Sequence, residues 1–205
     1  VYLSQPTELG TVYSRAELAA LAQVCRRHNL PLFVDGARLG YALAPGVSDV
    51  SLPDLAALCD AFTIGGTKCG ALFGEAVIIS NDLYKEHFRA MMKRGGGLLA
   101  KGRLLGIQFE VLLRDGLYQR ICAAAIDYAR DIRAAFAAQG VDFYGASTTN
   151  QQFPILAREQ ADYFRSAFGF AYWQAHGARH VVRYCTSWAT TAEEGRGLIA
   201  AIAPK

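Results

Sequence analysis

The feature that most constrains the fold is a series of short apolar segments, separated by helical stretches, in the first 80 residues. These segments are "LFVD" (32–35), "AFTIGG" (61–66) and "AVIIS" (76–80), and each has the length of a buried strand. Helices that alternate with buried strands at short spacing are typical of βαβ units. The sequence therefore predicts an α/β fold with a mostly parallel sheet and flanking helices.

Two helix starts in this region are clearly marked. Ser14 begins the motif "SRAE", a capping box in which Glu17 is the third helical residue, and apolar residues then recur at helical spacing to about His28. A second helix is expected from Ser51, because a proline in the first turn, here Pro53, is well tolerated. Both helices would connect neighbouring strands of the predicted sheet.

Beyond residue 80 the helical segments become longer. We expect helices at 81–94, 98–115, 117–140, 161–167 and 191–202, and strands at 141–145, 150–155, 170–176 and 180–188. The later strands would form a smaller sheet with helices packed on one side. We therefore predict two domains, 1–118 and 119–205, with the boundary inside a long helix.

Composition excludes several classes of protein. The net charge of +3 is small and its basic residues are scattered, which argues against a partner that is nucleic acid or a membrane surface. No apolar run is long enough to span a bilayer, and no signal peptide is recognisable. The five cysteines are widely spaced without a Cys/His cluster, so no metal site is predicted and reduced thiols in the cytoplasm are expected.

Charged residues occur where two predicted strands end. In "LFVDGAR" Asp35 ends a strand and Arg38 follows it, and in "FTIGGTK" Lys68 follows the next strand. Ligands of α/β sheets bind at the carboxyl ends of strands. A partly buried lysine can form a Schiff base, an aspartate can keep a pyridinium nitrogen protonated, and an arginine suits a carboxylate. This set predicts pyridoxal phosphate (PLP) chemistry.

The same segments resemble a known family. "FVDGARLGYAL" followed by "TIGGTKCGALFGEAVI" is similar to the aspartate and lysine segments of the threonine aldolase/β-eliminating lyase family, PLP enzymes of the aspartate aminotransferase fold. "TELGTVYSRAEL", "KRGGGLLAKGRLLG" and "HVVRYCTSWAT" also resemble segments of that family. The resemblance implies that residues 1–118 are the later part of a large PLP-binding domain and that residues 119–205 are a small α+β domain. It also implies that an N-terminal portion is missing.

The resemblance implies roles for individual residues. Lys68 would form the Schiff base with PLP, and Asp35 would bond the pyridine nitrogen. Thr67, beside the lysine, would contact the cofactor. Arg38 and Arg183 would bind the substrate carboxylate, with Arg38 also near the cofactor.

One cofactor contact departs from the family pattern. Family members carry an arginine just after the triple glycine, which reaches the cofactor phosphate of a neighbouring subunit. Leucine stands at that place here, so Lys101, or Arg94 before the glycines, would substitute for it.

Each of these residues also has a purely structural interpretation. Lys68 and Lys101 could be ordinary solvated lysines, and Asp35 could cap the helical segment that follows it. Arg38 could form an ion pair with Asp35. Arg183 interrupts an apolar strand and must be paired or serve a site. The cofactor interpretation is favoured for Lys68 and Asp35, because their motifs occur together and in order.

The expected activity is that of a PLP-dependent lyase of the threonine aldolase type, which cleaves a β-hydroxy amino acid to glycine and an aldehyde. Two alternatives stay open: PLP-dependent β-elimination or transamination of another amino acid, and a non-catalytic α/β domain that has lost its cofactor half. An enzyme of this family would be a homodimer or homotetramer, because the family builds its sites at subunit interfaces.

Overall fold

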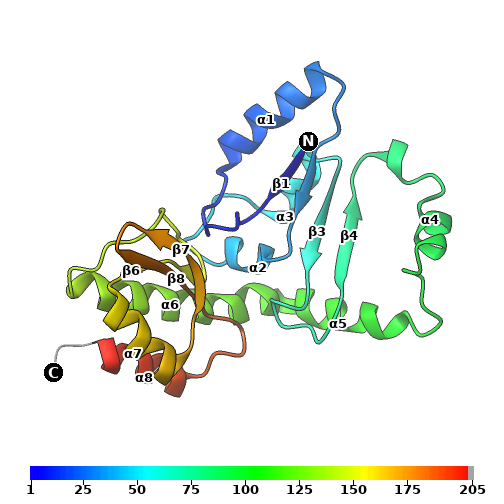
Figure 1. The fold of residues 1–205 in the computed structure, drawn as a ribbon. Coiled ribbons are helices and arrows are strands. Elements are labelled where there is room, and N and C mark those ends of the chain that lie inside the picture. Colours follow the sequence, from blue (N-terminus) through cyan, green and yellow to red (C-terminus); the bar gives the residue numbers. More distant parts are fainter. Residues whose placement is uncertain (203–205) are drawn as a thin grey trace.

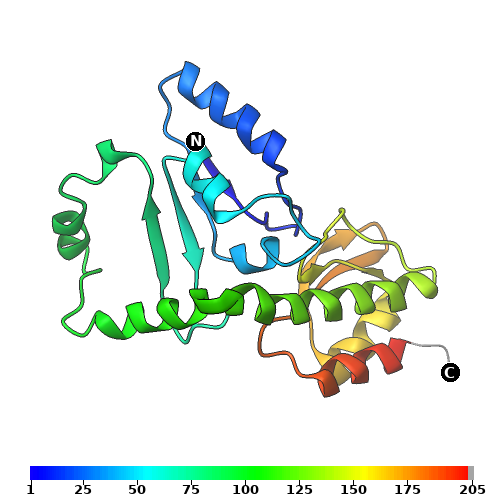
Figure 2. The same cartoon turned by 180° about the vertical axis from the view of Figure 1, so that it is seen from behind.

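The computed structural model describes residues 1–202 and contains two sheets joined by a long helix (Figures 1 and 2). The strands of the first sheet are β1 (Tyr2–Ser4), β2 (Phe33–Asp35), β3 (Ala61–Gly65) and β4 (Glu75–Ile79), in that order. The β1–β2 and β2–β3 pairs are parallel, and β3–β4 is antiparallel. The predicted mostly parallel α/β sheet is therefore confirmed.

The connections within this sheet are short helices. They are α1 (Arg15–Arg27), α2 (Leu39–Ala42) and α3 (Leu52–Leu58). The side chain of Ser14 accepts from the backbone N–H of Glu17, whose carboxylate accepts from that of Ser14, so the predicted capping box is confirmed. Ser51 and Asp54 form the same reciprocal pair at α3. Both helices thus begin where local sequence satisfies their free N–H groups.

The segment between the two sheets differs from expectation. It contains the 3₁₀ helices η1 (Asp82–Tyr84) and η2 (Arg114–Gly116) and the helices α4 (Phe88–Arg94) and α5 (Arg103–Leu113). The single helix predicted at 81–94 is wrong, because His87 adopts a left-handed conformation (φ 57°) that separates η1 from α4. The helix predicted from residue 98 begins only at Arg103, after a turn that follows the glycines.

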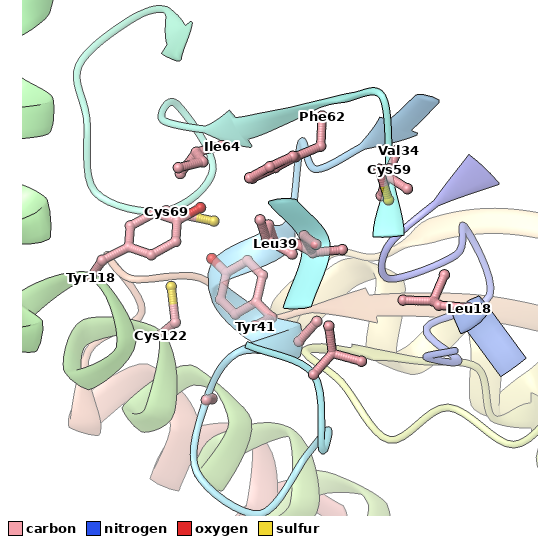
Figure 3. Packing of buried hydrophobic residues seen from close by; sticks show 14 of the residues in the cluster. Leu18, Val34, Leu39, Tyr41, Cys59, Phe62, Ile64, Cys69, Tyr118 and Cys122 are labelled. Atoms are coloured by element: carbon pink, nitrogen blue, oxygen red, sulfur yellow. The ribbon is translucent and has the colours of Figure 1, made fainter. Parts of the chain in front are cut away.

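The long helix α6 (Leu117–Ala138) confirms the helix predicted at 117–140 and contributes to two hydrophobic cores. Its first half packs against the first sheet through Tyr118 and Cys122, which Figure 3 shows beside the core residues of that sheet. Its second half supplies Ile132 and Phe136 to the core under the second sheet. The predicted boundary at 118/119 falls inside this helix and stays a prediction.

The second sheet is antiparallel throughout. Its strands are β5 (Gln151–Gln152), β6 (Ile155–Leu156), β7 (Ala171–His176) and β8 (Arg179–Cys185), and β8 pairs with the other three. The helices α7 (Arg158–Phe168) and α8 (Ala192–Ile202) lie with α6 along one face, as Figures 1 and 2 show. The smaller sheet with helices on one side is therefore as predicted.

Two strand predictions in this sheet need correction. The segment 141–145 forms only an isolated bridge between Phe143 and Pro154. The strand predicted at 150–155 is divided into β5 and β6, because Pro154 between them has no N–H to donate to a ladder. Of the helices in residues 1–202, none combines the length and hydropathy needed to cross a bilayer.

Candidate functional site

The ends of β2 and β3 are held together by two glycines. The N–H of Gly36 donates to the Thr63 hydroxyl (2.9 Å), and the N–H of Gly65 donates to the Gly36 carbonyl (2.9 Å). A Cβ atom on Gly36 would lie 1.9 Å from the Thr63 carbonyl oxygen, so no side chain fits there. This close approach places Asp35, the last residue of β2, beside the segment that leads from β3 to Lys68.

Two buried tyrosines hold the backbone around Lys68. The Tyr118 hydroxyl donates to the Gly65 carbonyl (2.8 Å) and accepts from the Gly40 N–H (3.1 Å). The Tyr41 hydroxyl donates to the carbonyl of Lys68 itself. Burial raises the pKa of both phenols, so both remain neutral donors. The backbone of Lys68 is therefore fixed from the core side, where Figure 3 shows both tyrosine rings.

The side chain of Lys68 is exposed, and it forms no ion pair with any residue in 1–202. The partial burial expected from its apolar neighbours is wrong, because those neighbours pack beneath the segment and leave its outer side open. A cavity of 320 Å³ lies on that outer side. Its lining is Ala37, Gly65, Gly66, Thr67, Lys68, Gly74 and Glu75. The lysine is thus available to a ligand in a place with small neighbours.

Asp35 does not cap the helix that follows it. One carboxylate oxygen accepts from the N–H of Ala37 (2.8 Å), and the other accepts from the hydroxyl of Tyr2. The hydrogen bond to Asp35 raises the pKa of the Tyr2 phenol. Helix α2 begins after Arg38, and no side chain caps it. The structural interpretation of Asp35 as a helix cap is therefore not what the structure shows.

Arg38 forms an ion pair with Glu8 rather than with Asp35. Its Nη1 lies 3.0 Å from the Glu8 carboxylate. The arginine side chain is 12% exposed, whereas that of Glu8 is 63% exposed. The pair therefore joins an anchored guanidinium to a carboxylate that extends into solvent.

Arg183 on β8 has an incomplete set of partners. Its Nη1 donates to the side-chain oxygen of Gln151 (3.3 Å), and its guanidinium carbon lies 5.6 Å from the centre of the Trp173 ring. Its Nε is buried and has no hydrogen-bond partner among residues 1–202. The guanidinium therefore has few protein partners among residues 1–202, which fits the expectation of a site role.

Three of the predicted cations act on one thiol. Desolvation raises the pKa of Cys185, and the positive charges of Arg38, Arg183 and Lys68 oppose this by lowering it. Such charge effects weaken quickly with distance. Contacts bring the same cations together: Arg38 pairs with Glu8, whose backbone carbonyl accepts from Gln151, which in turn accepts from Arg183. Ala37, next to Arg38, lines one cavity with Lys68.

The remaining predicted residues divide between this region and another. Thr67 lines the same cavity as Lys68. Lys101 lies in an exposed turn before α5, and no hydrogen bond or ion pair described for residues 1–202 links it to Asp35 or Lys68. Its expected contact with the cofactor phosphate stays a prediction.

The largest described cavity, of 700 Å³, lies elsewhere. It is enclosed by the end of α7, β8 and the start of α8. Of the predicted site residues only Arg183 borders it. Of the predicted site residues, Thr67 and Lys68 line the smaller cavity instead.

Sequence reasoning missed three residues of this region. Glu8 is paired with Arg38, and Asn150 donates to both Cys185 Sγ (3.4 Å) and the Thr186 carbonyl (2.7 Å). Gln151 contacts Arg183. The available signal was "NQQ" at 150–152, three amides in a segment otherwise expected to be a buried strand.

Fold and site together define a class of protein. An α/β sheet with flanking helices, followed by a smaller sheet, is the architecture of the fold-type I PLP-dependent enzymes. The family model described as "Beta-eliminating lyase" matches residues 1–173, and the chain belongs to that family. Threonine aldolases and β-eliminating lyases depend on PLP.

Known relatives agree with this assignment. Two low specificity L-threonine aldolases, from Pseudomonas sp. (strain NCIMB 10558) and Pseudomonas aeruginosa, are 31% and 33% identical to 98% and 97% of the chain. A solved threonine aldolase from Leishmania major superposes with a TM-score of 0.96 at 41% identity over 98% of the chain. The chain spans only 58%, 57% and 59% of these proteins, respectively.

Proposed function

We propose that this chain supplies the lysine and the carboxylate-binding arginines of a PLP-dependent lyase of the threonine aldolase type. Such an enzyme cleaves a β-hydroxy amino acid to glycine and an aldehyde. The observation that carries the proposal is geometric: contacts through Glu8 and Gln151 link Arg38 to Arg183, and hydrogen bonds of Gly36 and Gly65 join the strand end at Asp35 to the segment that leads to Lys68. An amine, two guanidinium groups and a carboxylate are the groups that PLP and an amino acid require.

The residues present fit the cofactor. The cavity beside Lys68 is lined by three glycines, and small residues allow a flat ring to approach the backbone. Lys68 would hold the cofactor, Asp35 would face its ring nitrogen, and Thr67 would contact it. Lys101 of a neighbouring copy would approach its phosphate. When bound, PLP supplies the electron sink for the bond that breaks.

The side chains of this chain would bind and orient the substrate and would keep a proton in place. Arg38 and Arg183 would hold the substrate carboxylate from two sides and so fix which bond at Cα faces the cofactor ring. Asp35 would keep the proton on the ring nitrogen. The exposed amine of Lys68 is open to exchange with the substrate amine. Glu8 would yield Arg38 to the substrate, because an ion pair with an exposed carboxylate is weak.

The test of the proposal is the substitution Lys68→Ala, with Lys93→Ala as a control at an exposed helical lysine. We expect Lys68→Ala to abolish the visible absorbance of the PLP-loaded protein and its release of aldehyde, and Lys93→Ala to change neither. Persistence of the absorbance in Lys68→Ala would show that another residue holds the cofactor. Release of a keto acid in place of glycine and aldehyde would favour elimination or transamination.

We further propose a homodimer or homotetramer in the cytoplasm. Support for association comes from apolar side chains exposed along α4 and α5, including Met91 and Leu104. Support for the compartment comes from the five cysteines, all of them free thiols.

A further inference from the structure

A continuous chain of contacts connects the two carboxylate-binding arginines. Arg183 donates to the side-chain oxygen of Gln151 (3.3 Å), and the side-chain nitrogen of Gln151 donates to the backbone carbonyl of Glu8 (3.2 Å). The carboxylate of Glu8 accepts from Arg38 (3.0 Å). Gln151 lies on the second sheet, whereas Glu8 lies between β1 and α1 of the first. One amide therefore bridges the two parts of the site.

Gln151 is placed to act as a rigid connection. It is 0% exposed, and its strand β5 is paired with β8 opposite Cys185. Its backbone carbonyl accepts from the Ser147 hydroxyl, which fixes the residue on the other side. Only one orientation of the amide works, because its oxygen must face the guanidinium of Arg183 and its nitrogen must face the carbonyl of Glu8.

The hydrogen bond to Gln151 is also the main constraint on the Arg183 side chain. Among residues 1–202, the bond to Gln151 is the only hydrogen bond made by the Arg183 side chain, and its Nε has none. Gln151 is neutral, so it orients the guanidinium without cancelling its charge. An acidic residue at the same place would compete with a substrate carboxylate for Arg183.

We propose that Gln151 is a positioning residue, which sets the guanidinium of Arg183 relative to the Glu8–Arg38 pair so that both arginines meet one carboxylate. This inference rests on the proposed function of that site. Gln151 contacts no substrate and acts through Arg183. Substrates would therefore be selected for a carboxylate group, because both fixed cations face it.

Gln152 offers a matched control on the same strand. It is also buried, and it likewise accepts from an arginine (Arg133 Nη1, 3.2 Å) and donates to a carbonyl (Thr149, 2.9 Å). Successive strand residues point to opposite faces, and Arg133 lies on α6, outside the site. If substitution acted only by lowering the stability of the protein, variants at Gln151 and at Gln152 would therefore have the same effect.

The experiment compares Gln151→Met and Gln152→Met in the PLP-loaded protein, with glycine as the probe. Calorimetric titration should show that Gln151→Met weakens glycine binding about 10- to 100-fold, the range for a lost hydrogen bond to a charged group. Its KM for a β-hydroxy amino acid should rise by the same factor while kcat changes little. Gln152→Met should leave both quantities unchanged despite a similar loss of thermal stability.

Gln151→Asn provides a second variant if Gln151→Met does not fold, because the shorter amide cannot reach both partners. Equal effects of the Gln151 and Gln152 variants on glycine affinity, or no effect of either, would overturn the inference. Failure of the unsubstituted protein to bind glycine would overturn the inference and the carboxylate site together. Glycine binding without aldehyde release would overturn only the proposed reaction.

Discussion

At the scale of single residues, the site combines free reactive groups with fixed support. The amine of Lys68 is exposed, whereas its carbonyl accepts from the buried Tyr41 and the nearby Gly65 carbonyl accepts from the buried Tyr118. A lysine that must change partners needs a free side chain and a fixed backbone. The tyrosines fix the backbone of the lysine without restricting its side chain.

Tyr118→Phe tests this support. The substitution leaves the Gly65 carbonyl and the Gly40 N–H without a partner in the core, which should lower the free energy of unfolding by about 1–3 kcal/mol. Urea unfolding measures the change. Tyr163→Phe is the control, because Tyr163 is exposed and its hydroxyl makes no hydrogen bond among residues 1–202. Equal stability of the two variants would contradict the role of Tyr118.

The site could be predicted from sequence only where a residue carries its own local signal. Lys68 and Asp35 lie in glycine-containing motifs after apolar strands, and Arg183 interrupts an apolar strand, so all three were recognisable. Glu8 carries no such signal, and Gln151 only the weak one of three consecutive amides, because their partners lie 30 and 32 positions away in the sequence. The exposure of Lys68 was likewise missed, since apolar neighbours in sequence do not reveal which side of a loop they cover.

At the scale of elements, two helices are joined at their starts. Arg15, the first residue of α1, lies 2.6 Å from the carboxylate of Asp54, which also closes the capping box of α3. Hydrogen bonds from Ser51 and then from Arg15 lower the pKa of Asp54 to about 2, from 3.8. The ionised carboxylate is therefore favoured in the folded chain.

This shift predicts a dependence of stability on pH. Because the folded pKa is depressed, Asp54 stabilises the fold above about pH 4 and loses this contribution as the pH falls toward 2. Asp54→Asn should lower the urea midpoint at pH 7, and the difference from the unsubstituted chain should shrink between pH 4 and pH 2. Asp131→Asn, at a carboxylate with no ion pair among residues 1–202, should show no such trend. A constant difference across this range would refute the assignment.

Elements with strong local signals were predicted, and those that depend on context were not. The capping box at Ser14 and the long apolar periodicity of α6 specify a helix on their own. A left-handed residue is usually recognised in a sequence because it is a glycine. The left-handed residue here is His87, so the break between η1 and α4 was missed. The segment 141–145 has the composition of a strand but finds only one bridging partner, because strand formation requires a neighbour that sequence alone does not identify.

At the scale of the whole molecule, the segment from β4 to α5 extends away from the rest of the chain (Figure 1). Several of its large apolar side chains are exposed, among them Leu83, Met91 and Leu104. Soluble proteins rarely leave so many apolar side chains uncovered in one region. We expect this segment to be covered by another copy of the chain in the assembled enzyme.

Leu104→Glu on α5 tests that expectation. Burying a leucine in an interface contributes about 1.5–3 kcal/mol, so replacing Leu104 by a charged residue should weaken self-association at least 10-fold. Light scattering during size-exclusion chromatography measures the mass of the assembly. Val24→Glu, at an exposed residue of α1, is the control and should leave the mass unchanged. An unaltered mass for Leu104→Glu would place the interface elsewhere.

Helix α6 has a consequence for how the molecule unfolds. Tyr118 and Cys122 at one end belong to the core of the first sheet, and Ile132 and Phe136 at the other belong to the core of the second. Loss of either core removes the packing that keeps its half of the helix folded, and helix formation is itself cooperative. We therefore expect the two sheets, although separate in hydrogen bonding, to unfold in a single cooperative transition.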